Sequence, residues 1–101
     1  MIKGVTAKEE KIIKSILKKY PCEFYYYGSR VKGGYTSASD LDILMKGGDY
    51  KIVESINLEF NNSYIPYIVN ISDFSTMDEH FYKLIEPDLV KIVWTNSNYL
   101  T

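Results

Sequence analysis

The chain has 101 residues, with 46% hydrophobic and 25% charged side chains, a composition that excludes disordered, collagen-like and coiled-coil proteins. Its 12 basic and 13 acidic residues give a formal net charge of −1, which argues against a global electrostatic grip on nucleic acid. No apolar run reaches the ~18 residues of a membrane helix, and the single cysteine, Cys22, has no partner for an internal disulfide. We therefore expect one domain over residues 1–101, without a membrane segment, in the reducing cytoplasm.

The spacing of apolar residues predicts an alternation of helices and strands. Thr6 and Glu9 have the separation of a capping box, and apolar residues then recur at helical spacing until Pro21. Later runs alternate between two faces, as half-buried strands do. In chain order, the expected elements are a helix at about 7–19, strands at 22–27 and 40–46, a helix at 50–60 behind an Asp49 cap, a strand at 64–72 and a helix at about 77–85.

The order α-β-β-α-β-α predicts an α/β (α+β) fold, in which helices cover a small mixed sheet of three to four strands. The segment between the first two strands, 28–39, is small and polar, so we expect a loop with one helical turn. Such a short connection favours antiparallel pairing of the two strands. Residues 89–94 fit either a further helical turn or an edge strand.

The segment 28–42 holds the residues that carry chemistry. Gly28 ends a strand, where a residue without Cβ lets the backbone turn tightly and lets a ligand approach. Ser29 follows with a hydroxyl and a main-chain amide at the expected helix start, a combination suited to phosphate. Arg30, the only arginine in the chain, is a candidate to neutralise phosphate charge.

Asp40 and Asp42 lie two residues apart on an expected strand, so their carboxylates project from the same face. Two unpaired carboxylates this close repel each other, and a divalent cation removes that repulsion. Carboxylate and phosphate oxygens are the ligands that Mg²⁺ prefers. A phosphate-binding turn and a metal-binding pair in one segment together indicate nucleotidyl transfer.

The pattern Gly-Ser, ten residues, Asp-x-Asp resembles the signature of the DNA polymerase β-type nucleotidyltransferases. The fuller pattern Gly-Ser-Arg-x-x-Gly…Ser-Asp-x-Asp resembles their small prokaryotic branch, the minimal nucleotidyltransferases. The resemblance implies the nucleotidyltransferase fold, Mg²⁺ as cofactor and ATP as substrate. It assigns metal binding to Asp40 and Asp42, phosphate binding to Gly28 and Ser29, and a helping role in nucleotide binding to Arg30 and Ser39.

One position departs from the family pattern. The segment 65–71 resembles the third active-site strand, which usually carries a third carboxylate, and Asn70 stands at that position. An amide oxygen can touch a metal, but it is neutral and a poor base. Asp73 has the wrong strand parity to replace it unless a bulge intervenes. Two interpretations therefore stay open: an active transferase, or a catalytically weakened module that binds a nucleotide or a partner.

The length leaves little room for a separate acceptor-binding domain. The resemblance implies that a partner completes the site, namely a small helical protein of the HEPN type in a toxin–antitoxin pair. In such a pair the nucleotidyltransferase is the antitoxin and attaches AMP to a tyrosine of the toxin. A transferase acting on nucleic-acid ends would need a basic track, against which the near-neutral charge argues. Association of the chain with its own copies stays open.

Overall fold

The computed structural model of the chain describes residues 2–94. Helices and strands alternate along it, as the apolar spacing predicts, and two 3-10 turns lie in its last third. In chain order the elements are α1 (Ala7–Leu17), β1 (Glu23–Tyr27), α2 (Ser29–Lys32), β2 (Leu41–Lys46), α3 (Tyr50–Asn61), β3 (Val69–Asp73), η1 (Phe74–Thr76), α4 (Glu79–Ile85), η2 (Glu86–Asp88) and β4 (Val90–Lys91).

The four strands of the described part of the chain form one mixed sheet in the order β3-β2-β1-β4. β1 pairs antiparallel with β2 and β4, whereas β2 and β3 run parallel. The expected antiparallel pairing across the 28–39 connection is therefore confirmed. The register places Tyr27, Asp42 and Asn70 side by side in one row across three strands. We call the sheet face that bears this row the site face, and the opposite one the core face.

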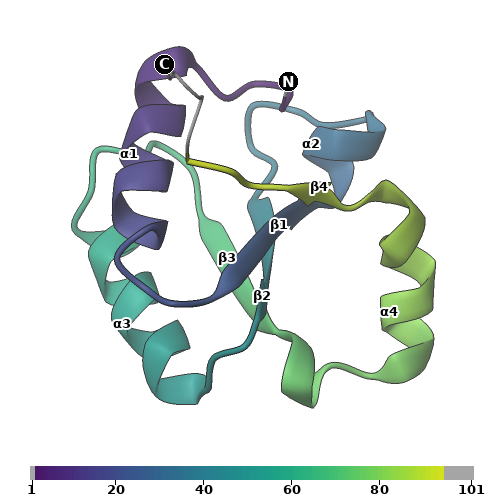
Figure 1. The fold of residues 1–101 in the computed structure, drawn as a ribbon. Helices are drawn as coiled ribbons and strands as arrows, with labels where there is room; N and C mark the ends of the chain where they lie inside the picture. The colour runs from purple at the N-terminus through teal and green to yellow at the C-terminus, as the bar shows by residue number, and fades with distance from the viewer. Residues whose placement is uncertain (1, 95–101) are drawn as a thin grey trace, which may run out of the picture.

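The core face is covered by α1 and α3, which lie on the same side of the sheet (Figure 1). Leu41, Ile43 and Met45 of β2 are completely buried there, because alternate side chains of a strand point to one face. α1 begins with the expected capping box: the Thr6 hydroxyl accepts from the Glu9 amide, and the Glu9 carboxylate accepts from the Thr6 amide. The sequence pattern and the packed helix therefore agree.

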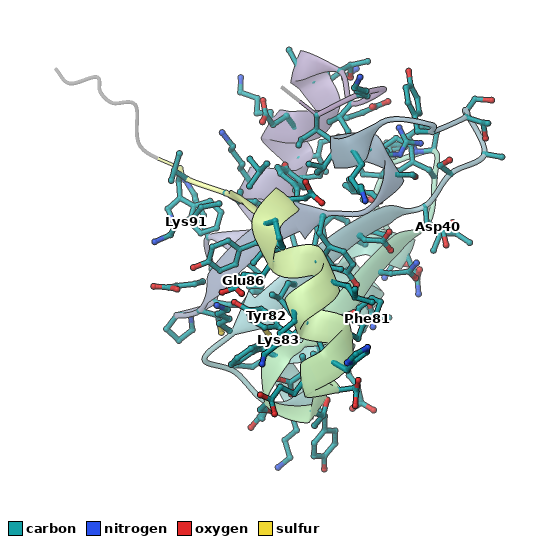
Figure 2. The ribbon with its side chains drawn as sticks, turned by 90° about the vertical axis from the view of Figure 1, so that its right-hand side faces the viewer. Asp40, Phe81, Tyr82, Lys83, Glu86 and Lys91 are labelled. Atoms are coloured by element: carbon teal, nitrogen blue, oxygen red, sulfur yellow. The ribbon has the colours of Figure 1, made fainter. Side chains whose placement is uncertain are left out.

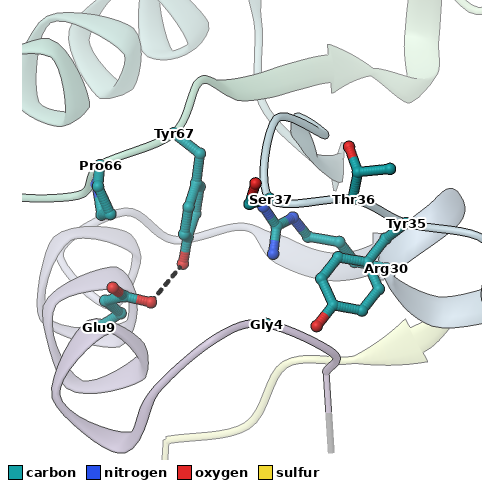
Figure 3. A pocket seen from close by; sticks show the side chains of 8 residues that line it. All are labelled: Gly4, Glu9, Arg30, Tyr35, Thr36, Ser37, Pro66 and Tyr67. Atoms are coloured by element: carbon teal, nitrogen blue, oxygen red, sulfur yellow. Dashed lines mark hydrogen bonds between the residues drawn. The ribbon is translucent and has the colours of Figure 1, made fainter.

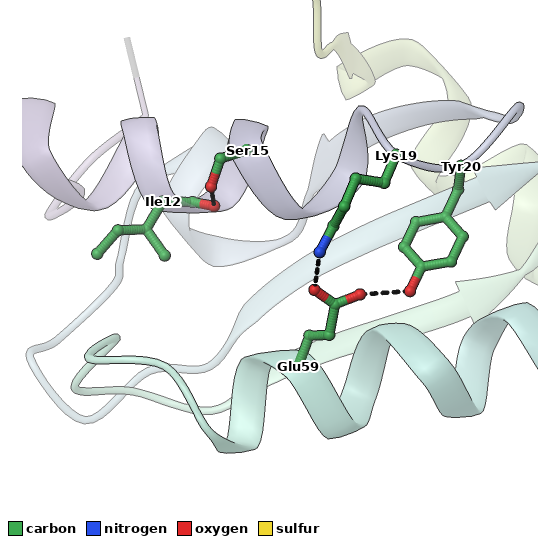
Figure 4. Close-up of polar contacts among 5 residues, drawn as sticks. All are labelled: Ile12, Ser15, Lys19, Tyr20 and Glu59. Atoms are coloured by element: carbon green, nitrogen blue, oxygen red, sulfur yellow. Dashed lines mark hydrogen bonds and ion pairs between the residues drawn. The ribbon is translucent and has the colours of Figure 1, made fainter.

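A polar contact joins the end of α1 to α3 (Figure 4). The Glu59 carboxylate accepts hydrogen bonds from the Lys19 ammonium and from the Tyr20 hydroxyl. These bonds lower the pKa of Glu59 below its usual range, and the bond to Glu59 raises the pKa of Tyr20 to about 12. One carboxylate on α3 thus fixes the chain where it leaves α1.

α4 lies on the opposite side of the sheet, across part of the site face (Figures 1 and 2). None of its residues is buried, and one of its contacts with the sheet is a lysine of β2. The Lys46 ammonium donates to the Tyr82 hydroxyl at 2.9 Å and lies 4.7–5.1 Å from the ring centres of Tyr25, Phe74 and Tyr82. Figure 2 looks onto this helix and shows Asp40 beside it, not behind it. The helix therefore leaves this part of the site face uncovered.

One expected strand is shorter than its sequence pattern. The alternation over 64–72 predicts a strand, but only its last part belongs to β3. Ile65 and Tyr67 do pack against the core, partly buried, which produces the alternation. Between them Pro66 has no amide hydrogen to donate to a ladder, and the Ile68 carbonyl accepts the hydrogen bond at which pairing with β2 begins.

The remaining boundaries differ by small amounts. α4 begins at Glu79 because the Asp78 side chain caps it, accepting from the Phe81 amide. The undecided segment 89–94 contains an edge strand, β4. Asp73 keeps its core-face parity, and its carboxylate accepts hydrogen bonds from Ser75. It caps η1 and does not replace the missing third carboxylate.

Candidate active site

The acid pair lies where β2 begins. Asp40 immediately precedes β2, Asp42 is its second residue, and Asn70 of β3 stands opposite Asp42. The Asn70 amide nitrogen donates to both carboxylates, at 2.9 Å to Asp40 Oδ2 and 3.3 Å to Asp42 Oδ1. The two carboxylates therefore converge on one group, as the two-residue spacing predicts. The third position, degenerate in sequence, belongs to the same cluster in space.

The turn at Gly28 touches this cluster directly. Gly28 has φ 91° and ψ −161°, a backbone region that is essentially restricted to glycine. A Cβ at this position would lie 2.4 Å from Asp42 Oδ2, so the carboxylate occupies space that any other residue would fill. α2 begins at the next residue, Ser29, and the first amides of a helix have no acceptor within it. An anion held by these amides would therefore lie beside the acid pair.

The environment of Asp42 disfavours its negative charge. Burial raises the pKa of Asp42, and the nearby charge of Asp40 acts in the same direction, whereas the hydrogen bond from Asn70 lowers it. Removing a carboxylate from water beside a second carboxylate destabilises the ionised form. A bound cation would favour the ionised form of Asp42.

Tyr27 is a neighbour of Asp42 that the sequence analysis did not assign to the site. Its hydroxyl lies 3.0 Å from the Ser72 hydroxyl oxygen, and its ring meets Phe81 edge-on with 6.3 Å between ring centres. The side chain is buried, and it stands directly beside Asp42 in the β1–β2 register. Its strand parity, off the core face and just before Gly28, is the signal that would have identified it.

Arg30 and Ser39, the expected helpers in nucleotide binding, both make hydrogen bonds in the loop before Asp40. Arg30 is 2% exposed, and its guanidinium donates to the Ser39 carbonyl, at 2.8 Å from Nη2 and 3.2 Å from Nε, and to the Lys3 carbonyl at 3.1 Å. The Ser39 hydroxyl accepts from the Thr36 amide at 2.8 Å. Both side chains thus build the loop before Asp40.

A comparison with known protein families decides which kind of site this is. Residues 9–97 match the family described as nucleotidyltransferase domain. The chain belongs to this family. The fold class expected from sequence is confirmed with it, and so is the resemblance of this nucleotidyltransferase to the minimal members of the superfamily.

Two similar proteins agree with this assignment. The nucleotidyltransferase is 29% identical over 93 residues to a Haemophilus influenzae protein named as a protein adenylyltransferase, MntA, covering 87% of this chain and 82% of that protein. A crystal structure from Sulfolobus solfataricus, described as a nucleotidyltransferase, superimposes with a TM-score of 0.50 at 20% identity. It covers 90% of this chain and 81% of that one, and at this identity it shows the fold alone.

The donor set of this nucleotidyltransferase fits a divalent cation. Asp40 and Asp42 supply the hard carboxylate oxygens that Mg²⁺ prefers, and burial together with the charge of Asp40 raises the pKa of Asp42. Rotation of the Asn70 amide would present its oxygen in place of its nitrogen. Within residues 2–94 no cluster of three or more His, Cys, Asp or Glu side chains is in place to hold a metal ion. The candidate ligands are therefore two carboxylates and one neutral amide.

Helices in the described residues, 2–94, are all too short or too polar to cross a membrane.

Proposed function

We propose that this nucleotidyltransferase transfers AMP from ATP to a tyrosine of a HEPN-type helical protein, acting as the antitoxin of the pair in the cytoplasm. The observation that carries the proposal is the contact between Gly28 and Asp42, which places the turn expected to bind phosphate beside the acid pair. The relative named as a protein adenylyltransferase supports AMP as the group and a protein as the acceptor.

Each residue of the cluster has a distinct role in this proposal. Asp40 and Asp42 would hold Mg²⁺, which when bound offsets the negative charge of the phosphates during transfer. The main-chain amides at Ser29 would donate to the triphosphate beyond the bond that breaks. Asn70, hydrogen-bonded to both carboxylates, would keep the acids on one side of the sheet.

The acceptor chemistry is consistent with the neutral third position. Transfer forms a bond between the acceptor oxygen and the α-phosphorus and breaks the bond to pyrophosphate, and the acceptor proton is lost to water. Asn70 cannot take that proton. A tyrosine hydroxyl, with a pKa of about 10, loses its proton more readily than an aliphatic hydroxyl does. A phenolic acceptor therefore suits a site without a third carboxylate.

A second candidate function is a catalytically weakened module that binds a nucleotide or a partner. The specific observation in its favour is the Asn70 amide, which donates to both acids and lacks the charge of a third carboxylate. In this case the site would hold ATP and the partner without transferring AMP.

An incubation with ATP, Mg²⁺ and a HEPN-type partner tests both functions through the intact mass of the partner. The transferase proposal predicts that the partner gains the mass of AMP with the wild-type protein and gains none with Asp42→Asn. Binding without a mass gain, together with transfer by Asn70→Asp, would instead identify the weakened module. An unchanged partner mass with both the wild type and Asn70→Asp would contradict the transferase assignment.

A further inference from the structure

Arg30 holds the segment that leads into Asp40. Two of its guanidinium nitrogens share one acceptor, the Ser39 carbonyl, and the third donates to the Lys3 carbonyl. The main chain of Lys3 in turn donates to the Arg30 carbonyl at 3.1 Å. Ser39 is the residue directly before Asp40, so the guanidinium fixes the peptide from which the first acid projects.

The same guanidinium also contacts the segment that leads into β3. It lies 4.3 Å from the ring centre of Tyr67 and 5.2 Å from that of Tyr35, and the close-up in Figure 3 shows it between the two rings. The Tyr67 hydroxyl donates to Glu9 at 3.1 Å, the carboxylate that completes the α1 capping box. Tyr67 precedes Asn70 by three residues, so its placement bears on the third position of the site.

The two segments meet at the start of the β2–β3 ladder. The Leu41 amide donates to the Ile68 carbonyl at 2.8 Å, and Arg30 contacts the chain on both sides of this bond, through Ser39 and Tyr67. We propose that Arg30 is a positioning residue that sets Asp40 relative to Asn70 by holding both entry segments. The inference rests on the proposed role of the acid pair in binding a divalent cation.

A lysine cannot take over these contacts. The guanidinium is planar and donates from several nitrogens in a fixed fork, and it stacks on aromatic rings, whereas an ammonium is a compact point charge. Arg30 is 2% exposed and forms one wall of a cavity of about 580 Å³ lined also by Gly4, Tyr35 and Tyr67. Arg30→Lys therefore retains the charge and loses the fork and the stacking.

The wild-type protein provides the first test, because its single arginine gives one Nε–H signal in nuclear magnetic resonance. A proton bonded to the Ser39 carbonyl in a buried site exchanges slowly with water whether or not nucleotide is present. We expect slow exchange in the free protein and little change on adding a non-hydrolysable ATP analogue. Fast exchange in the free protein, with protection only after the analogue is added, would identify a phosphate contact and overturn the proposal.

The second test compares Arg30→Lys with Lys51→Gln, a control substitution of an exposed cation on α3. Removing an outer partner of a metal ligand lowers metal affinity by roughly tenfold or more. We expect Arg30→Lys to weaken Mn²⁺ binding, followed by electron paramagnetic resonance with the ATP analogue, by about this factor. We also expect it to shift the Asn70 side-chain amide signals of the metal-free protein. Lys51→Gln should change neither.

Wild-type Mn²⁺ affinity and unshifted Asn70 signals in a folded Arg30→Lys protein would overturn the proposal. If Arg30→Lys does not fold, two measurements still test the proposal: the exchange of the Arg30 Nε proton in the wild type, and the Asn70 side-chain amide signals of Tyr67→Leu. That variant removes the stacked ring and leaves the hydrogen bonds of Arg30, and the same Asn70 shift is expected from it. The amide signals require no turnover, so failure of this inference is distinguishable from failure of the transferase proposal.

Discussion

Gly28 and Asp42 behave as one unit at the scale of single residues. The glycine adopts φ 91° and ψ −161°, and the Asp42 carboxylate lies where its Cβ would be. The backbone conformation and the close approach each require glycine, for separate reasons. Any replacement therefore disturbs the turn and the acid together.

Gly28→Ala is expected to abolish AMP transfer and to lower the free energy of unfolding by about 1–3 kcal/mol. The new methyl group would overlap Asp42 Oδ2 at 2.4 Å, so the carboxylate must leave its place. Transfer is measured by the mass of the acceptor protein, and stability by chemical denaturation.

Gly47→Ala is the matched control for this substitution. Gly47 also has a positive φ, of 93°, but a Cβ there meets no atom within 4 Å. The Gly47→Ala variant should have a lower free energy of unfolding, because of backbone strain alone, and should still transfer AMP. Equal activity losses in the two variants would show that strain, not displacement of Asp42, is responsible.

The sequence predicts part of this cluster and not the rest. Strand parity correctly places Asp40, Asp42 and Asn70 on one face, because the two-residue period of a strand is local information. The partners of Arg30 are main-chain carbonyls of Lys3 and Ser39. Nothing in the spacing along the chain reveals such acceptors.

At the scale of elements, α4 is the least firmly attached helix of the described chain. It contributes no buried residue, and its contacts with the sheet include the Lys46 ammonium among three rings and the Tyr27–Phe81 ring pair. Individual cation–π contacts at partly exposed sites contribute about 0.5–1 kcal/mol. Its position therefore depends on few interactions.

Lys46→Met is expected to loosen α4 without unfolding the protein. The hydrogen bond to Tyr82 and the three ring contacts are lost, while the core-face packing is untouched. Hydrogen exchange should become faster in residues 79–85 and stay unchanged in α1 and α3, with less than about 2 kcal/mol lost in global stability. Uniformly faster exchange in all helices would show that Lys46 supports the whole fold.

The link between α1 and α3 predicts a pH dependence. Hydrogen bonds from Lys19 and Tyr20 lower the pKa of Glu59 below its usual 4.5, so the folded state holds its proton less tightly than the unfolded state. This contribution is present above pH 4.5 and is lost as the pH falls through the folded pKa. Because the side chains of Lys19 and Glu59 are partly exposed, their interaction contributes less than about 1 kcal/mol to the free energy of unfolding.

Glu59→Gln tests this link through the free energy of unfolding at several pH values. The wild type should be the more stable protein at neutral pH, and the difference should shrink toward zero in acid, where Glu59 is protonated. A difference that persists unchanged in acid would show that the charge of Glu59 is not its cause.

The elements illustrate where apolar spacing suffices and where it does not. β1 and β2 agree with their predicted ranges within one residue, and the Asp49 cap of α3 is confirmed by its bond to the Ile52 amide. The predicted third strand is too long, because Ile65 and Tyr67 alternate into the core without pairing. β4 has two residues, too few for any periodicity to show.

At the scale of the whole molecule, stability and function lie on opposite faces of one sheet. The core face carries Leu41, Ile43 and Met45 of β2, all fully buried against α1 and α3, whereas the acid pair and Asn70 lie on the site face, together with the buried Leu44. Polar changes at the site, such as Asp42→Asn, therefore leave the packed core intact. This separation permits the activity of site variants to be compared at equal stability.

The arrangement also explains why a second protein suits the proposed reaction. In the view of Figure 2, Asp40 lies beside α4 and is not covered by this helix. The described part of the chain consists of a single sheet and the helices that pack on it. An acceptor approaching this uncovered part of the site face would complete the site from outside.

Crystals grown with Mn²⁺ and a non-hydrolysable ATP analogue test the central claim most directly, through the anomalous scattering of the metal. We predict a metal peak between the carboxylates of Asp40 and Asp42, with the triphosphate on the main-chain amides that follow Gly28. A nucleotide bound elsewhere, for example in the cavity between Tyr35 and Tyr67, without metal at the acid pair, would contradict the account.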